Sequence, residues 1–455
     1  MRESEAVMRR LSGLIDNEHG VALVLALMIL LTLTGLVLAF LSASAFEPQI
    51  SRNHSETVRA RYVAEAGVEY AYDTLASNDG SWDRYLVGAT CTQGAVLGAP
   101  DSTLPGLGSA HGTFTVRIRN DCRAGDDKLT GVAVDTVTGR CDPASPGDAT
   151  HDGNCKVVVT STGTIGTTSR AITVVVSRTA DLAINGALAF PGAQADLSIR
   201  ASSFVIDGRD SRIGDRPGTP TGAGAAVYGI AVNGAAATLS DRLETVLAAA
   251  AQTDVRGKDR TDPSATARGV STIQADGALT SQAVTEFVDA AKSAADITIN
   301  TSPGRGSSLA NVGATCAADR ESSTCWGTSA RPKIVYVRGA LPDVGTRYTS
   351  LILAGASSGT GILIVENGIV EIGGSFRWNG PIIATGRNVG IRFRGDGSQV
   401  VSGAVIVNEL NPLAVANLEG DTVGKPNILY SSEALGLVQN ALRRRLVTTQ
   451  NWTDQ

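Results

Sequence analysis

Few residues in this chain have the types and spacing that catalysis needs. None of the four histidines lies in an H-E-x-x-H arrangement, and no G-x-S-x-G, Walker A or dinucleotide-binding pattern occurs in a suitable context. Asp207, Asp210 and Asp215 could pair as acid and base, but the glycines and prolines around them indicate turns. We therefore expect neither an enzyme nor a cofactor.

One polar loop, residues 141–155, could bind a cation. Asp142, Asp148 and Asp152 offer carboxylate oxygens, which are ligands that Ca²⁺ prefers. Their spacing does not match the D-x-D-x-D-G pattern, followed by a glutamate, of calcium-binding loops. We therefore expect a solvated loop without a metal, and a cation site at these three aspartates is the alternative.

The six cysteines all follow a long apolar run near the N-terminus. Their even number is typical of an oxidising compartment, where disulfides persist. The short gaps from Cys141 to Cys155 and from Cys316 to Cys325 favour bridges between sequence neighbours, and other pairings remain open. The candidate disulfide residues are Cys91, Cys122, Cys141, Cys155, Cys316 and Cys325.

The composition limits the class of protein. A chain of 455 residues is too long for one ordinary core, so about two or three domains are expected. The net charge of −5 provides no basic surface for nucleic acid. Only 4% of the residues are aromatic and 51 are glycine, which favours turn-rich β structure over an all-helical protein.

The apolar run, Val21 to Phe46, contains 26 residues and no charge. About 20 such residues suffice for a helix to cross the hydrocarbon core of a membrane. The run could be a secretory signal cut after Ala45, a plain anchor, or an element used both for cutting and for assembly. The apolar segment of a signal peptide has about 7–15 residues, which disfavours the first interpretation.

The helix is expected to continue beyond the membrane as an amphipathic segment to residue 79. Val58, Tyr62 and Tyr70 recur at multiples of four residues and therefore share one face. Pro48 lacks a backbone donor and is expected to kink the helix near the membrane surface. The Asn-Asp-Gly sequence at 78–80 should end it.

A short charged leader ending at Gly20, an apolar helix and the motif AEAGVEYA at 64–71 follow one another. This N-terminus resembles that of type IV pilins, most closely the PilX-type minor pilins. The resemblance implies that a prepilin peptidase cuts the Gly20–Val21 bond on the cytoplasmic face and that the retained helix packs into a filament core. The residues assigned to that filament-core helix are Leu25, Val58, Tyr62, Glu65 and Tyr70.

Leu25 departs from the family pattern. Major pilins carry a glutamate at the fifth position after the cut, whereas some minor pilins and the K-type pseudopilins of type II secretion lack it. An unpaired carboxylate in lipid is costly, so a subunit with no neighbour above it can dispense with the glutamate. The resemblance thus implies a role at the tip or in initiation, with other major and minor pilins and the inner-membrane assembly platform as partners.

The sequence predicts an α+β fold in which the long helix packs on an antiparallel β domain, residues 80–180. Residues 181–320 have mixed α/β patterns, with helices at 240–251 and 280–296. In the β domain a hairpin turn is expected at Gly163–Ser169. The expected strands of that domain are Thr113–Asn120, Gly131–Thr136, Lys156–Ser161 and Ala171–Ser177.

Residues 321–455 are expected to form a β-rich C-terminal domain. Short apolar segments at 333–408 are separated by Asn-Gly or Asp-Gly turns. A parallel β-helix, or solenoid, would stack such segments around an Ile/Val interior, and a meander of hairpins would need the same turns. The solenoid is favoured, with a closing helix at 431–446.

These features predict a minor pilin or pseudopilin-like subunit of a type IV pilus machine. Residues 1–20 would be its prepilin leader and 21–79 its long helix, with 21–46 crossing the bacterial inner membrane once and the C-terminal part outside. After assembly the subunit would lie at the pilus tip. The alternative is a membrane-anchored extracytoplasmic binding or adhesion protein, whose β-rich tail contacts a surface ligand.

Overall fold

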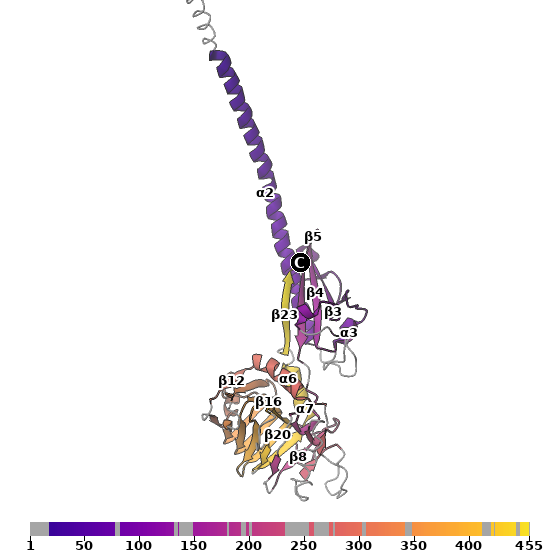
Figure 1. Cartoon of the computed structure of the whole chain (residues 1–455), viewed down its shortest axis with the longest axis vertical. Coiled ribbons are helices and arrows are strands. Elements are labelled where there is room, and N and C mark those ends of the chain that lie inside the picture. Colours follow the sequence, from indigo (N-terminus) through magenta and orange to yellow (C-terminus); the bar gives the residue numbers. More distant parts are fainter. Residues whose placement is uncertain are drawn as a thin grey trace, which may run out of the picture.

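The long helix carries two bodies, a small one beside its C-terminal half and a large one beyond its end (Figure 1). The small body consists of the described residues between 82 and 179 together with 447–454, and the large body of the described residues between 182 and 442. The computed structural model describes residues 18–77, 82–131, 135, 149–179, 182–192, 197–199, 203–232, 254–258, 273–275, 278–302, 306–341, 348–411, 420–422, 424–442 and 446–454.

Helix α2, Glu18–Ala76, includes both the apolar run and the amphipathic segment. The helix continues through Pro48 and does not end at this proline. Every side chain from Val21 to Ser42 is exposed. The second half buries one face on the small body, through Ala60, Val63, Ala64, Val68, Ala71 and Leu75.

The small body contains an antiparallel sheet in the order β1-β3-β4-β5-β23, and β2 also pairs with β3. The predicted strand Thr113–Asn120 is confirmed as β3, whose alternate residues Phe114, Val116 and Ile118 face the helix. The other strands are β1 Ala95–Val96, β2 Ser102–Thr103, β4 Lys156–Ile165, β5 Thr168–Arg178 and β23 Val447–Asp454.

The structure corrects two predictions about this sheet. The predicted hairpin is confirmed, but its turn is shorter than Gly163–Ser169, because the strands pair as far as Ile165 and Thr168 and leave a two-residue turn. Gly166, at φ 59°, provides the left-handed backbone that so tight a turn needs. Gly131, predicted to begin a strand, instead ends the short helix α4, Asp127–Thr130, and most of that predicted strand lies outside the described residues.

The last strand gives the chain an unexpected topology. β23 pairs with β5 from Val447 opposite Arg178 to Asp454 opposite Ile172. The large body is therefore inserted between two neighbouring strands of the small sheet. The end of the predicted C-terminal domain, 321–455, thus belongs to the small body, because the chain returns there to complete the sheet edge.

The large body contains a wide and a narrow parallel sheet. The wide sheet has the order β10-β8-β22-β20-β18-β16-β14-β12, joined by β6, β9 and β11, and the narrow sheet has the order β13-β15-β17-β19-β21-β7. From β12 to β22 successive strands alternate between the sheets, and all pairs are parallel. These strands therefore do not form a meander of hairpins, which needs antiparallel neighbours.

The strands of the wide sheet are β6 Gly186–Phe190, β8 Val205–Asp207, β9 Tyr228–Val232, β10 Val255–Arg256, β11 Ile273–Ala275, β12 Ile297–Asn300, β14 Lys333–Arg338, β16 Ala356–Glu366, β18 Ser375–Gly386, β20 Ser398–Glu409 and β22 Lys425–Tyr430. Those of the narrow sheet are β7 Leu197–Ile199, β13 Ser307–Ala310, β15 Thr349–Ala354, β17 Ile369–Gly373, β19 Gly390–Arg394 and β21 Gly420–Thr422. Strands from both sides of residue 320 share each sheet, so the predicted boundary there separates no structural units.

Both faces of the central wide-sheet strands are buried, which explains their continuous apolar sequences. In β16, Leu363 and Val365 face the core between the sheets, whereas Ile362 and Ile364 face outward under two helices. These helices are α6 Ser281–Ser293 and α7 Ser432–Leu442. The helix predicted at 280–296 is confirmed, and that at 240–251 lies outside the described residues.

The predicted closing helix at 431–446 is described as α7 from Ser432 to Leu442, and it covers a face of the wide sheet. Val438 and Leu442 of α7 share an apolar cluster with Ile383 and Ile406. Glycines occupy matching places within three neighbouring strands, at Gly361, Gly380 and Gly403, all with positive φ. A Cβ at Gly380 would lie 2.2 Å from the carbonyl oxygen of Gly361, so no larger residue fits.

We expect Gly380→Ala to lower the thermal unfolding midpoint of the full chain in detergent by several degrees. The added methyl group must displace the backbone of the neighbouring strand. Gly436→Ala in α7 is the matched control, because a Cβ there meets no atom within 4 Å and alanine favours a helix. Equal midpoints for Gly380→Ala and the unaltered chain would contradict the close approach.

Candidate functional site

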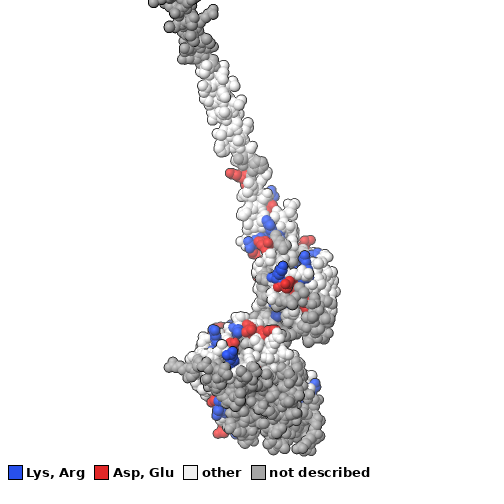
Figure 2. Space-filling view, in the orientation of Figure 1, with Lys and Arg blue, Asp and Glu red and all other residues white. Residues whose placement is uncertain are grey.

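The first half of α2 is an apolar surface that this chain does not cover. By length and composition α2 is a helix able to cross a membrane. Leu25 is 55% exposed, and Figure 2 shows no charged side chain along this part of the helix. The Gly20–Val21 bond lies within the first turn, since α2 begins at Glu18. This surface requires either lipid or another protein around it.

The second half of α2 exposes part of its predicted stripe. Val58 is 36%, Tyr62 64% and Tyr70 40% exposed. Tyr70 lies at the margin of the small sheet, where its ring centroid is 5.8 Å from that of Phe114. The side facing the sheet includes several small residues among its valines and leucine, and the sequence did not predict this face. A Cβ at Gly163 of β4 would lie 2.3 Å from the carbonyl oxygen of Ala60, so helix and strand backbones are in close contact. In the sequence, the alanines at 60, 64 and 71 indicate the side of α2 that packs closely on the sheet.

An ion-pair network fixes the last strand to the helix. Arg61 Nε lies 3.3 Å from Glu65, one helical turn further along α2, and also 3.3 Å from Asp454 of β23. At the other end of this strand, the Tyr72 hydroxyl donates to the carbonyl oxygen of Val447 at 3.1 Å. The end of the chain thus becomes part of the surface that α2 presents.

The two bodies meet at an apolar contact. The chain crosses from the small body to the large body there and later returns at the same place. The outgoing Thr179 N–H donates to the carbonyl oxygen of the returning Leu446 at 3.0 Å. Beside them is a cavity of about 40 Å³, lined by residues of α2, the small body and the large body, among them Leu75, Trp82 and Phe287. Side chains from all three parts pack together, so the large body is not attached by a single open linker.

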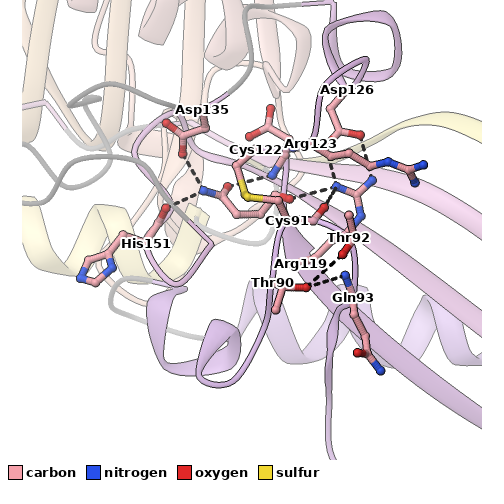
Figure 3. Close-up of a disulfide and its surroundings, with 12 residues drawn as sticks. Thr90, Cys91, Thr92, Gln93, Arg119, Cys122, Arg123, Asp126, Asp135 and His151 are labelled. Atoms are coloured by element: carbon pink, nitrogen blue, oxygen red, sulfur yellow. Dashed lines mark hydrogen bonds and ion pairs between the residues drawn. A yellow bond between two sulfur atoms is a disulfide. The ribbon is translucent and has the colours of Figure 1, made fainter.

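A disulfide and a group of acidic residues lie at one end of the small sheet (Figure 3). Cys91–Cys122 ties the loop after α3, Asp83–Leu86, to the end of β3. Arg119 donates to both carboxylate oxygens of Asp126, at 2.5 and 2.8 Å. Such a charge-assisted fork holds the loop after β3 in place and leaves these two side chains little capacity for another ligand.

Two carboxyl groups near this disulfide are fully buried and have raised pKa values. Burial raises the pKa of Asp152 to about 7, although Arg178, at 3.9 Å, lowers it in part. Burial likewise raises the pKa of Asp121 to about 6, opposed by the amide of Asn154, which donates to both oxygens. The nearby charge of Asp135 raises both values further.

The alternative of a cation site at residues 141–155 receives no support from the part of the loop that is described. Asp142 and Asp148 lie outside the described residues, and Asp152 Oδ1 accepts the backbone N–H of Lys156 at 3.0 Å. Within the described ranges, no three histidine, cysteine or acidic residues are grouped so that they could hold a metal ion.

The pairing of cysteines follows sequence order where it can be seen. Cys91 is bonded to Cys122, and Cys316 to Cys325, as predicted. Cys155 is also in a disulfide, and its predicted partner Cys141 lies outside the described residues.

The aspartates considered for acid–base chemistry are bound within turns. Asp207 forms an ion pair with Arg209 at 2.7 Å, and Asp215 accepts the backbone N–H of Arg212 at 2.8 Å. Asp210 accepts the backbone N–H of the first residue of α7 at 2.8 Å. These carboxylates therefore hold turns and a helix end together.

Comparisons with known proteins add little. No protein-family profile and no curated protein sequence matches this chain. Among solved structures, it shows a likeness to the competence-associated pilin ComZ from Thermus thermophilus. That likeness has a TM-score of 0.23 and 10% sequence identity, and covers 88% of this chain and 97% of the other. At this TM-score it carries no argument about this chain.

We expect Asp152→Asn to raise the thermal midpoint of the full chain at pH 8 and to leave it nearly unchanged at pH 4. The carboxyl group has a pKa of about 7 when folded and an ordinary value of 3.8 when unfolded. The folded chain therefore binds the extra proton, and stability falls as the pH rises through that interval. Asparagine should remove this loss, on the order of a few kcal/mol.

Asp127→Asn, at an exposed position of α4, is the control for this pH effect and should change neither midpoint. A midpoint for Asp152→Asn below that of the unaltered chain at pH 8 would show that the carboxylate stabilises the fold instead.

Proposed function

We propose that this chain is a minor pilin or pseudopilin-like subunit of a type IV pilus machine, cut by prepilin peptidase between Gly20 and Val21. One observation carries the proposal. A single helix has an uncovered, uncharged first half and a second half packed closely on an antiparallel sheet. The first half needs lipid before assembly and other helices afterwards, and the transfer costs little because both surroundings are apolar.

The proposed orientation places the leader in the cytoplasm and both bodies outside the bacterial inner membrane. The disulfides Cys91–Cys122 and Cys316–Cys325 support this, because such bonds persist in oxidising compartments. The partners would be the prepilin peptidase, other major and minor pilins and the inner-membrane assembly platform.

We further propose that the large body is a β-solenoid that favours a place at the tip or in initiation. Strands that alternate between two parallel sheets, with glycines at matching places in neighbouring strands, support a coiled chain. The large body lies beyond the end of α2 (Figure 1), where its bulk would hinder addition of a further subunit. Leu25, in place of the family's glutamate, favours the same position, and the outer surface of the solenoid could then meet a surface ligand.

The experiment compares Gly20→Val with Gly35→Val in cells that make filaments. We expect Gly20→Val to remain at full length in the membrane and to be absent from sheared filaments, because the valine side chain obstructs the backbone at the bond that the peptidase must bind, whereas glycine has no side chain. Gly35→Val is the control for processing and should lose its leader like the unaltered chain, since no atom lies within 4 Å of a Cβ there.

Processing and incorporation of Gly20→Val would contradict cleavage at Gly20. Absence of the unaltered chain from filaments, with its leader intact, would leave the alternative of a membrane-anchored binding protein.

A further inference from the structure

Four aspartates surround one short segment of the small body, residues 152–154. Each of these three residues donates a hydrogen bond to a different carboxylate. The Asp152 N–H donates to Asp83 of α3 at 2.8 Å, the Gly153 N–H donates to Asp135 at 2.7 Å, and the Asn154 amide donates to both oxygens of Asp121 at 3.1 and 2.9 Å. The fourth carboxylate is that of Asp152 itself, so all four belong to one group, which we call the acidic group.

Three carboxylates of the acidic group are buried. Asp121, Asp135 and Asp152 are each at most 2% exposed. Asp135 Oδ1 and Asp152 Oδ2 are buried and accept no hydrogen bond from the described part of the chain. Burial disfavours the ionised form of a carboxyl group, and a second carboxylate nearby disfavours it further. The acidic group therefore takes up protons more readily than separate aspartates in water do.

One guanidinium group faces the acidic group, that of Arg178 at the end of β5. Its Nε lies 3.9 Å from Asp152 Oδ2, which is beyond hydrogen-bonding distance. Two other cations nearby are used elsewhere. The Lys156 ammonium group donates to a backbone carbonyl oxygen at 3.1 Å, and Arg119 is paired with Asp126. Arg178 is therefore the cation that responds to the charge of Asp152.

Arg178 also lies over an aromatic ring. Its guanidinium carbon is 5.3 Å from the centroid of the Trp82 ring, within the range of a cation–π interaction. Trp82 is buried and donates its indole N–H to the carbonyl oxygen of Leu75 in α2 at 3.2 Å. Trp82 and Arg178 both line the cavity between the two bodies, and Arg178 alone is charged among the described residues around that cavity. One guanidinium group thus has two partners, the acidic group and the contact between the bodies.

We propose that Asp152 and Arg178 form a pH-sensitive switch that controls the contact between the two bodies. While Asp152 is protonated, the guanidinium group stays over the Trp82 ring. When Asp152 ionises, it draws the guanidinium group into a hydrogen-bonded ion pair, because a charge-assisted hydrogen bond is about twice as strong as a neutral one. The contact then loses a packed side chain beside Thr179, whose N–H donates to Leu446 across it.

The switch operates near neutral pH. Burial raises the pKa of Asp152 to about 7 and that of Asp121 to about 6. The closed contact binds the proton more tightly than the open one, in which Arg178 is closer to Asp152. Closing is therefore favoured in acid and lost as the pH rises through about 7. The other charged and titratable groups around the pair are Asp83 of α3, Asp121 directly after β3, Asp126, Asp135, His151 and Lys156 of β4.

The test measures hydrogen exchange of the full chain in detergent at pH 6 and pH 8.5, corrected for the intrinsic pH dependence of exchange, in peptides that contain Thr179. We expect protection to fall at least about tenfold from the lower to the higher pH, since one unit of pKa shift corresponds to a factor of ten. Asp152→Asn keeps an oxygen for the Lys156 N–H but cannot ionise, so its protection should stay at the value found at pH 6. Asp127→Asn, at an exposed position of α4, is the matched control and should behave like the unaltered chain.

A second measurement follows the fluorescence of Trp82 from pH 5 to pH 9. Each chain is compared with its own Trp82→Phe counterpart, so that the difference reports Trp82 alone. We expect a transition with a midpoint near pH 7. Asp135→Asn should move this midpoint to lower pH, because it removes a like charge near Asp152. A merely structural role of Asp135 would leave the midpoint where it is.

Two results would overturn the inference. One is the same protection at both pH values in the unaltered chain, or an equal loss of protection in Asp152→Asn. The other is a Trp82 transition whose midpoint Asp135→Asn does not move, and this result decides alone if Asp152→Asn fails to fold. Neither measurement needs filaments or the peptidase, so the switch and the proposed function stand or fall separately.

Discussion

Twenty-six consecutive uncharged residues on one helix impose the constraint on which the rest of this structure depends. They extend for about 39 Å, somewhat more than the hydrocarbon thickness of a membrane. This chain covers none of their side chains from Val21 to Ser42. The same helix then continues into the small body without a break. A change in the position of the apolar half is therefore transmitted directly to the folded part of the molecule.

The small body is built to hold that helix. The close approach of Gly163 to the backbone at Ala60 leaves no room for rotation of the helix against the sheet. β23 adds a second attachment, through Tyr72 at one end and Arg61 at the other. Because the large body is inserted between β5 and β23, it is joined by two adjacent passages of chain and by the apolar packing around Leu75 and Phe287. Helix and large body are thus linked through a common sheet.

The sequence predicted the elements whose signals are local. The alternation in Thr113–Asn120 and the apolar face of α6 needed only neighbouring residues, and both are confirmed. The sequence could not reveal that the final strand pairs with a partner some 270 residues earlier, because strand pairing leaves no local trace. Parallel pairing in the large body has a signal in the sequence. Gly361, Gly380 and Gly403 recur at intervals of 19 and 23 residues, and these intervals separate matching places in neighbouring strands.

At the candidate site, the sequence predicted the row of residues on α2 that includes Tyr62. It did not predict that Tyr62 lies on the exposed side of the helix. The polar loop at 141–155 left a cation site as an alternative, because acidic residues can be recognised from the sequence alone. The hydrogen bonds that use Asp152 as a backbone acceptor depend on the folded path of the chain.

The most direct test of the account is the mass of the mature N-terminus, measured in cells with and without the prepilin peptidase. The account predicts a chain that starts at Val21 and that appears only when the peptidase is present. A start at Phe46 would mean that the helix is discarded as a signal peptide, and an intact Met1 in both strains would mean an ordinary anchor. Either of these results would contradict the assignment of α2 to a filament.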